Sequence, residues 1–167
     1  MTPSAPNTVR PASWTDVTEL TELLNRIIER GGTTAHQQPL SEIEFANKFL
    51  EAPTLLSCFV ACHHDGTRLG FQHLQSKTGL PDGWGDIATF ALIDSPVRGV
   101  GTALFSATKA AAQNTGLTAI NAKIRADNVP GLGYYTKMGF VDYAVEKAVP
   151  LSDGTPVDRI SKKYMLK

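Results

Sequence analysis

A glycine-rich turn between an apolar strand and an alanine-rich helix constrains this chain more than any other feature of its sequence. The turn follows the apolar stretch 87–93 and consists of Arg98, Gly99, Val100, Gly101, Thr102 and Ala103. The first N–H groups of a helix have no partner inside it, and the helix dipole makes that end attractive to anions. The turn is therefore predicted to bind a pyrophosphate through backbone N–H groups.

Two common phosphate-binding motifs do not fit this turn. A nucleoside-triphosphate P-loop ends in Gly-Lys-Ser/Thr, whereas here Gly101 is followed by Thr102 and Ala103. A dinucleotide-binding turn needs a third Gly or Ala three residues after the second glycine, and position 104 is Leu. It also needs an acidic residue about 20 residues further on, where the chain reads Thr-Ala-Ile-Asn. Both nucleotide-binding motifs are therefore excluded.

The turn instead fits the pattern Q/R-x-x-G-x-G/A, with Arg98, Gly101 and Ala103 at the fixed positions. A second motif, N-x(6)-Y-x-K-x-G-F, follows after a segment with the pattern of a strand. Its fixed residues are Asn128, Tyr135, Lys137, Gly139 and Phe140. Together the two motifs resemble those of the GCN5-related N-acetyltransferase (GNAT) family, and the resemblance extends over residues 85–141.

The GNAT resemblance implies an α/β fold in a single N-acetyltransferase domain over residues 1–167. That fold has a central mixed, mostly antiparallel sheet of six to seven strands and about four helices. Its fourth and fifth strands start side by side and then splay apart, and the gap holds the pantetheine arm of the coenzyme. Without the resemblance, the pattern of elements predicts only a mixed α/β domain.

Capping signals and hydrophobic periodicity place the individual elements. Ser13 with Asp16, and Ser41 with Glu44, have capping-box spacing and are expected to begin two helices. The first helix ends at the glycine pair 31–32 and the second ends by Pro53. Further helices are expected at 102–115 and 129–138. Strands are expected at 8–11, 55–62, 69–74, 85–93, 118–125, 140–149 and 156–166.

The resemblance further implies acetyl-coenzyme A as cosubstrate and assigns residues to it. The backbone of Ala91, Leu92 and Ile93 would pair with the pantetheine amides and polarise the thioester carbonyl through an N–H. The turn from Arg98 to Ala103 would hold the pyrophosphate, and its two glycines would be needed because a Cβ would block the approach.

Asn128 and Tyr135 are the side chains that the resemblance assigns to the second motif. Asn128 would contact the pantetheine or diphosphate part of the coenzyme, or would simply cap the short helix that follows it. Tyr135 would be the general acid that protonates the departing thiolate. Tyr134 is expected on the other side of the helix, and the alternative role for either ring is core packing.

The sequence leaves the general base and the acceptor amine open. Asp86, Glu44, His73 or a chain of waters could accept the proton of the amine. In the family the first two helices and their connection line the acceptor pocket. We therefore expect Thr33, Thr34 and His36 to bind substrate, together with Asp86. This connection is polar and nearly uncharged, which favours a small zwitterionic or neutral amine, such as an amino acid or a phosphinothricin-like compound, over an aminoglycoside.

Two other functions remain open at this stage. The chain could acetylate a protein or peptide at an N-terminus or a lysine. It could also be a noncatalytic module that binds acyl-coenzyme A, although a pure binding module has no use for the general acid Tyr135.

Composition excludes several other classes of protein. Lys plus Arg and Asp plus Glu both number 16, so no net positive charge attracts nucleic acid. Residues 1–13 contain three prolines and no apolar core, and no segment is apolar enough to span a membrane. We therefore expect a cytoplasmic protein without nucleic-acid or membrane partners, and a homodimer remains possible. The four histidines and two cysteines show no metal-ligand spacing, so no metal is expected. Cys58 and Cys62 are predicted to be buried thiols that do not pair with each other.

Overall fold

The computed structural model describes residues 6 and 8–167. The other residues, 1–5 and 7, belong to the segment 1–13 interpreted above as lacking a signal peptide, so that interpretation lies partly outside the described residues. The elements in chain order are β1 (Thr8–Pro11), a 3₁₀ turn (Trp14–Asp16), α1 (Val17–Arg30), α2 (Glu42–Phe49), β2 (Leu55–Cys62), β3 (Arg68–Gln75), β4 (Trp84–Ala91), α3 (Val100–Asn114), β5 (Ala119–Arg125), α4 (Val129–Met138), β6 (Val141–Pro150) and β7 (Pro156–Met165).

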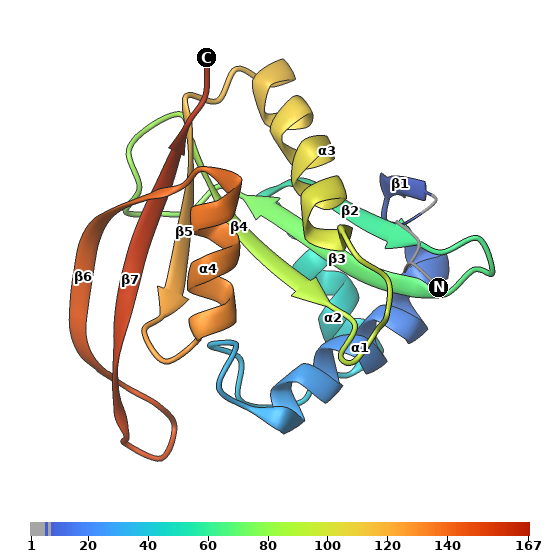
Figure 1. Ribbon diagram of the computed structural model, residues 1–167, viewed down its shortest axis with the longest axis horizontal. Coiled ribbons are helices and arrows are strands. Elements are labelled where there is room, and N and C mark those ends of the chain that lie inside the picture. Colours follow the sequence, from blue (N-terminus) through green and yellow to red (C-terminus); the bar gives the residue numbers. More distant parts are fainter. Residues whose placement is uncertain (1–5, 7) are drawn as a thin grey trace.

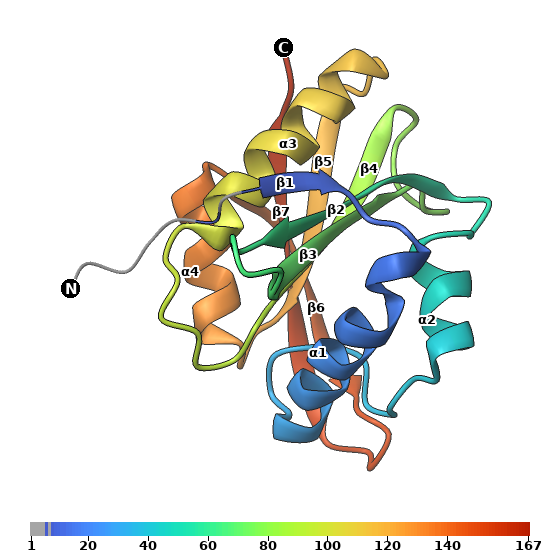
Figure 2. The same cartoon turned by 90° about the vertical axis from the view of Figure 1, so that its right-hand side faces the viewer.

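The seven strands form one sheet in the order β1-β2-β3-β4-β5-β7-β6. All neighbours are antiparallel except β4 and β5. Helices α3 and α4 cover one side of the sheet, and α1 and α2 cover the other (Figures 1 and 2). This architecture confirms the predicted fold class, because the resemblance implied a mixed, mostly antiparallel sheet of six to seven strands with about four helices.

Strands β4 and β5 separate soon after they begin. Their pairing runs only from Trp84 opposite Ala119 to Asp86 opposite Asn121. Beyond this point β4 continues to Ala91 against β3, and β5 continues against β7. The expected splay is therefore confirmed, and one edge of β4 lies without a strand partner from residue 87 onward.

Local signals account for where the helices begin. At Ser41 both bonds of the capping box form, and α2 starts at the next residue as predicted. The capping box of Ser13 and Asp16 also forms, but it opens a 3₁₀ turn, and the α-helix starts only at Val17. The third helix starts at Val100, two residues before the predicted position, because Gly99 caps it with a φ of +76°, which suits glycine.

Two apolar cores flank the sheet. The core under α1 and α2 includes Leu20, Leu24, Phe45 and Phe49, all at most 1% exposed. The core under α3 and α4 contains Phe105, Ile120 and Phe140, among others. Cys58 and Cys62 are buried and unpaired, as predicted, and burial raises the pKa of the Cys58 thiol to about 12. Cys58 therefore stays protonated and behaves as a packing residue.

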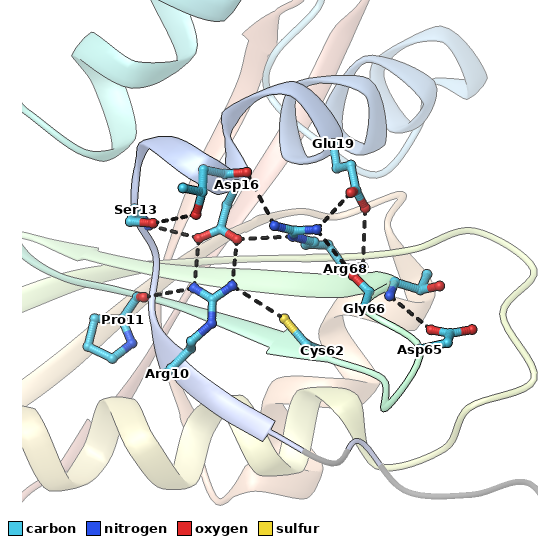
Figure 3. A network of polar contacts seen from close by, with 11 residues as sticks. Arg10, Pro11, Ser13, Asp16, Glu19, Cys62, Asp65, Gly66 and Arg68 are labelled. Carbon is cyan, nitrogen blue, oxygen red and sulfur yellow. Dashed lines mark hydrogen bonds and ion pairs between the residues drawn. The ribbon is translucent and has the colours of Figure 1, made fainter.

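Asp16 joins the start of α1 to β1 and β3. The carboxylate is fully buried and accepts hydrogen bonds from both guanidinium nitrogens of Arg10 (2.8 and 2.9 Å) and from Nε of Arg68 (3.0 Å) (Figure 3). The N–H of Ser13 donates a further bond (2.8 Å). Burial alone would raise the pKa of Asp16, but these bonds outweigh it and hold the pKa at about 2. The network therefore remains ionised across the physiological range.

Candidate functional site

A cavity of about 640 Å³ opens where β4 and β5 separate. Its walls come from the far half of β4, the end of β5, α4 and the connection between α1 and α2. Nine of the predicted site residues line it: Thr33, Thr34, His36, Asp86, Ala91, Ile93, Gly101, Asn128 and Tyr135. The other predicted residues, which are Leu92, Arg98, Gly99, Val100, Thr102 and Ala103, do not line it.

The backbone at the end of β4 faces two directions. The N–H of Leu92 donates to the carbonyl of Leu69 at 2.8 Å, so it faces β3 and is already bonded. Backbone groups alternate between the two edges of a strand, so those of Ala91 face the gap. The prediction that all of Ala91, Leu92 and Ile93 offer backbone groups to the coenzyme is therefore wrong for the N–H of Leu92. Strand β4 also ends at Ala91 rather than at the predicted residue 93.

The start of α3 has helix N–H groups without partners inside the helix, and one of its side chains is buried. Arg98 and Gly99 are exposed, and the first intrahelical bond runs from the N–H of Ala103 to the carbonyl of Gly99 (3.0 Å). The N–H groups of residues 100–102 precede that bond and therefore have no partner within the helix. Val100, however, is 7% exposed and packs into an apolar cluster with Leu104, so its side chain serves the core.

Gly101 is required for a different reason from the one predicted. A Cβ on Gly101 would lie 2.5 Å from Cε1 of Tyr134, a distance that real Cβ atoms do not reach. The space beside Gly101 is therefore filled by the tyrosine ring of α4. This glycine therefore allows α3 and α4 to pack closely, a role that the sequence did not predict.

Tyr134 and Tyr135 lie side by side at the cavity and belong to one hydrogen-bond network. Tyr134 donates to the carbonyl of Gly101 (2.8 Å) and accepts from Nε2 of Gln72 (3.0 Å). The hydroxyl of Tyr135 lies 2.8 Å from the hydroxyl of Thr89, which also accepts from Gln72 (3.0 Å). The two rings are in contact, with centroids 4.9 Å apart, and both line the cavity. Tyr134 was expected on the other side of the helix, but it faces the same cavity as Tyr135.

The two hydroxyls differ in what their protons can do. The proton of Tyr134 is committed to a carbonyl, which can only accept. In the pair of Tyr135 and Thr89 either oxygen can be the donor. When Thr89 donates, the O–H of Tyr135 is available to a group in the cavity. Burial raises the pKa of Tyr135 above its ordinary value and that of Tyr134 to about 12, so both phenols are protonated at neutral pH.

Asn128 acts as a helix cap and as a tether. Its Oδ1 accepts the N–H of Gly131 (3.0 Å) at the start of α4, and its Nδ2 donates to the carbonyl of Thr33 (3.1 Å). A Cβ on Gly131 would lie 2.3 Å from this side chain. The alternative role as an N-cap is therefore confirmed, and Asn128 also holds the connection between α1 and α2 against α4.

The connection between α1 and α2 is held over the cavity at a second point. Arg125, the last residue of β5, donates from Nη1 to the carbonyl of Thr34 at 3.1 Å. The hydroxyl of Thr34 in turn accepts the N–H of His36 (3.1 Å). Burial lowers the pKa of His36 to about 4, so its imidazole is neutral at pH 7. Thr33, Thr34 and His36 thus form one wall, as predicted from sequence.

Two of the three candidate bases reach the cavity. Asp86 lies at the last paired position of β4; its Oδ1 accepts from Nδ2 of Asn121 (2.8 Å) and its Oδ2 lies 3.7 Å from Nζ of Lys77. His73 lines the cavity from β3, its Nε2 has no hydrogen-bond partner among the described residues, and burial lowers its pKa to about 4. Glu44 does not line the cavity; it is exposed and bonds Ser41 in the capping box, so it is not a candidate.

The sequence analysis missed most of the charge around the cavity. Among the described residues that line it, only Asp86 is acidic, whereas six are basic: Arg30, Lys48, Lys77, Lys123, Arg125 and Arg159. These residues come from five different elements and connections, so no local motif announces them. The missed partners Gln72 and Thr89 had no distinctive local signal, because their strands contain other polar residues, such as His73 in β3 and Asp86 in β4.

Across the described part of the chain, no group of three or more His, Cys, Asp or Glu side chains is arranged to hold a metal ion. Within the same residues, none of the helices is both long and apolar enough to cross a membrane.

Comparison with known proteins identifies relatives at the level of family and fold. The model of the acetyltransferase (GNAT) family matches residues 18–140. None of the curated proteins compared with the chain matches it.

Three solved structures with the same fold illustrate the range of relatives. A phosphinothricin acetyltransferase from Sinorhizobium meliloti, in complex with acetyl-coenzyme A, is 20% identical with a TM-score of 0.83, and the match covers 95% of this chain and 88% of that one. An N-acetyltransferase from Staphylococcus aureus Mu50 is 18% identical (TM-score 0.83; 96% and 98% covered). A ribosomal-protein-alanine N-acetyltransferase from Brucella melitensis is 16% identical (TM-score 0.80; 95% and 99% covered).

Proposed function

Because the chain belongs to the acetyltransferase (GNAT) family, we propose that it transfers the acetyl group of acetyl-coenzyme A to the primary amine of a small molecule. The observation that carries this proposal is the cavity between the separated strands, with the hydroxyl of Tyr135 in its wall. A noncatalytic binding module would have no use for a phenol whose proton can be offered to the cavity.

The residues present fit acetyl-coenzyme A. The edge of β4 beyond Asp86 has no strand partner, which supports a role in which the backbone of Ala91 would pair with the pantetheine amides. The first turn of α3 would hold the diphosphate through the N–H groups of residues 100–102, and Arg98, exposed beside it, would add a positive charge. When bound, acetyl-coenzyme A supplies an activated acyl group in the form of a thioester.

The protein's own groups would lower the barrier to transfer in two ways. An N–H on the free edge of β4 would stabilise the negative charge that develops on the thioester oxygen, because it is already oriented before the reaction begins. Tyr135 would donate its proton to the departing sulfur and would then be reprotonated from solvent, with Thr89 holding the oxygen in place.

The proton of the incoming amine is assigned to Asp86, directly or through water. Its carboxylate is 12% exposed and lies at the point where the strands separate, and Asn121 fixes the orientation of one oxygen. His73 is the second candidate, since its neutral imidazole has an unpaired Nε2. An α-amine needs little assistance, because with a pKa near 8 roughly a tenth of it is neutral at pH 7.

The charge of the cavity indicates the class of acceptor. Four of the six basic residues that line it, Arg30, Lys77, Lys123 and Arg125, each have a carboxylate partner. Lys48 and Arg159 have none among the described residues, so an amine that also carries an anionic group would be attracted more strongly than a polyamine or an aminoglycoside. We therefore favour an amino acid or an amino-acid-like compound over a cationic amine.

A coenzyme A release assay tests this proposal. The protein and acetyl-coenzyme A would be incubated together with one candidate amine at a time. The candidates are amino acids, phosphinothricin, polyamines, aminoglycosides and short peptides. We expect release with one or more of the amino acids or with phosphinothricin, and none with the polyamines. Release with peptides alone would instead support protein acetylation, and calorimetric binding of acetyl-coenzyme A without release for any amine would support the noncatalytic module.

A further inference from the structure

The guanidinium of Arg159 is buried in the wall of the cavity and is incompletely hydrogen-bonded. Arg159 belongs to β7 and is only 8% exposed. Its Nη1 has no hydrogen-bond partner among the described residues. A buried charged donor without a partner costs free energy, so such a group is expected where a ligand completes its bonding.

The carboxylates close to Arg159 are already bonded to other cations. Asp127 receives two bonds from Arg125, at 2.7 and 2.9 Å. Glu146, which lies opposite Arg159 in the pairing of β6 and β7, binds Nζ of Lys123 at 2.9 Å. Three cations therefore share two carboxylates, which leaves one positive charge in this wall without a counter-ion.

The strand register places Arg159 near the level of the reacting groups. The strands part after Asp86, and Thr89, which bonds the hydroxyl of Tyr135, lies three residues further along β4. On β5 the residue paired with Asp86 is Asn121, and Arg125 lies four residues beyond it. Measured along the strands from this last pair, Thr89 and Arg125 therefore differ by about one residue, or about 3.3 Å. Arg159 is the register partner of Arg125 on β7.

Arg159 lies on the face of the sheet that the connection between α1 and α2 covers. Side chains directly opposite each other on paired strands share a face, and Arg125 on that face bonds the carbonyl of Thr34. Helix α3, whose start is assigned to the diphosphate, lies on the other side of the sheet (Figure 2). The position of Arg159 therefore matches an acceptor and not the coenzyme.

We propose that Arg159 binds an anionic oxygen group of the acceptor, a carboxylate or a phosphinate, and thereby selects amino-acid-like amines over neutral ones. A guanidinium presents two parallel donors that match two oxygens of such a group. This inference rests on the proposed transfer to a small amine and names the residue that recognises its anionic part.

The first experiment measures anion binding and needs no turnover. Acetate and methylphosphonate are titrated into the full-length protein by calorimetry, using wild type, Arg159→Met and the control Lys147→Met. Lys147 is on the same hairpin, with its side chain 78% exposed and away from the cavity. We expect Arg159→Met to weaken binding of at least one anion by about tenfold or more, as for loss of a charge-assisted hydrogen bond, and Lys147→Met to match wild type.

The thermal unfolding midpoint without ligand separates binding from a structural role. If Arg159 serves a ligand, Arg159→Met removes an unpaired buried charge, and the midpoint should stay the same or rise. A clear fall would assign a structural role to Arg159. If Arg159→Met does not fold, Arg159→Lys replaces it in the anion titrations. Lysine keeps the positive charge but lacks the two parallel N–H donors of the guanidinium, so we expect an intermediate anion affinity.

The second experiment uses the best acceptor from the release assay and its neutral carboxamide or ester. In Arg159→Met we expect KM for the anionic acceptor to rise about tenfold or more, with little change in kcat, in KM for the neutral analogue or in the affinity for acetyl-coenzyme A. Equal anion binding by wild type and variant, or a loss of acetyl-coenzyme A affinity, would overturn the assignment. Failure of wild type to acetylate any amine would refute the proposed function, while the calorimetry still decides whether Arg159 binds anions.

Discussion

Adjacent tyrosines on α4 differ in their hydrogen-bond partners. Both rings are largely buried, line the same cavity and touch each other. Tyr134 donates a hydrogen bond to a backbone carbonyl of α3 and so joins the two helices. Tyr135 shares its hydrogen bond with the hydroxyl of Thr89 and can release its own proton. The spacing of the motif selects Tyr135, and the hydrogen-bond partners give a physical reason for that selection.

Tyr135→Phe is predicted to lower turnover while leaving the coenzyme site intact. Phenylalanine keeps the ring and its packing but removes the proton offered to the thiolate. General acid catalysis contributes about 10²–10⁴ in rate, and since a thiolate leaves readily, we expect a loss of kcat of about 10² or less. Steady-state kinetics, with calorimetric titration of acetyl-coenzyme A, measure both effects.

Tyr134→Phe is the matched control for that variant. It loses bonds to Gly101 and Gln72, so its free energy of unfolding should fall by about 1 to 2 kcal/mol. Its kcat should stay close to that of wild type. An impaired Tyr134→Phe beside an active Tyr135→Phe would show that the general acid is Tyr134.

Between elements, the packing of α3 against α4 depends on the absence of a side chain at one position. Gly101 lies in the first turn of α3, and the ring of Tyr134 occupies the space where its Cβ would be. The carbonyl of Gly101 also accepts the tyrosine hydroxyl. The close approach of the two helices therefore places Tyr134 and Tyr135 beside the free edge of β4.

Gly101→Ala is predicted to destabilise the protein, with weaker coenzyme binding as a consequence. The new methyl group would force the ring of Tyr134 aside, and overpacking of this kind costs about 1 to 3 kcal/mol. Chemical denaturation measures the loss. Gly133→Ala on α4 is the control, because nothing lies within 4 Å of its Cβ position and its φ is not positive. It should be neutral or stabilising by up to about 1 kcal/mol, and equal losses in both variants would contradict the packing explanation.

For the molecule as a whole, the two buried histidines link stability to pH. Burial lowers the pKa values of both His36 and His73 to about 4, from an ordinary value of 6.5. The unfolded chain therefore binds more protons than the folded protein between these values. Both imidazoles are neutral in the folded protein at pH 7, which keeps them compatible with the aromatic rings of Phe49 and Phe90.

The free energy of unfolding is predicted to be highest above pH 6.5 and to fall as the pH drops toward 4. Below that range the histidines contribute no further loss. Denaturant titrations at several pH values measure the slope, and the variant His36→Gln/His73→Phe should show a flatter profile over this range. An unchanged slope in this variant would assign the pH dependence to other groups.

The order of the elements and the proposed coenzyme-binding turn follow from local sequence signals. The capping box at Ser41 and the glycine at the start of α3 act over a few residues, so they can be read without a fold. Two details depended on tertiary neighbours and were not predicted. The helix α1 begins only after a 3₁₀ turn, and the N–H of Leu92 is hydrogen-bonded to the carbonyl of Leu69. The family motifs supplied the splay of β4 and β5, which composition and periodicity alone could not predict.

The acceptor side of the site was decided by tertiary structure. Arg125 and Arg159 are far apart in the sequence and become neighbours only through the register of β5 and β7. Their cavity wall also needs the connection around Thr34, which hydrogen bonds from Arg125 and Asn128 hold in place. Local signals act within a few residues, whereas recognition of an acceptor needs charges collected from distant segments. The sequence motifs therefore predicted the fold through the family resemblance, and only the packed sheet determined which charges line the cavity.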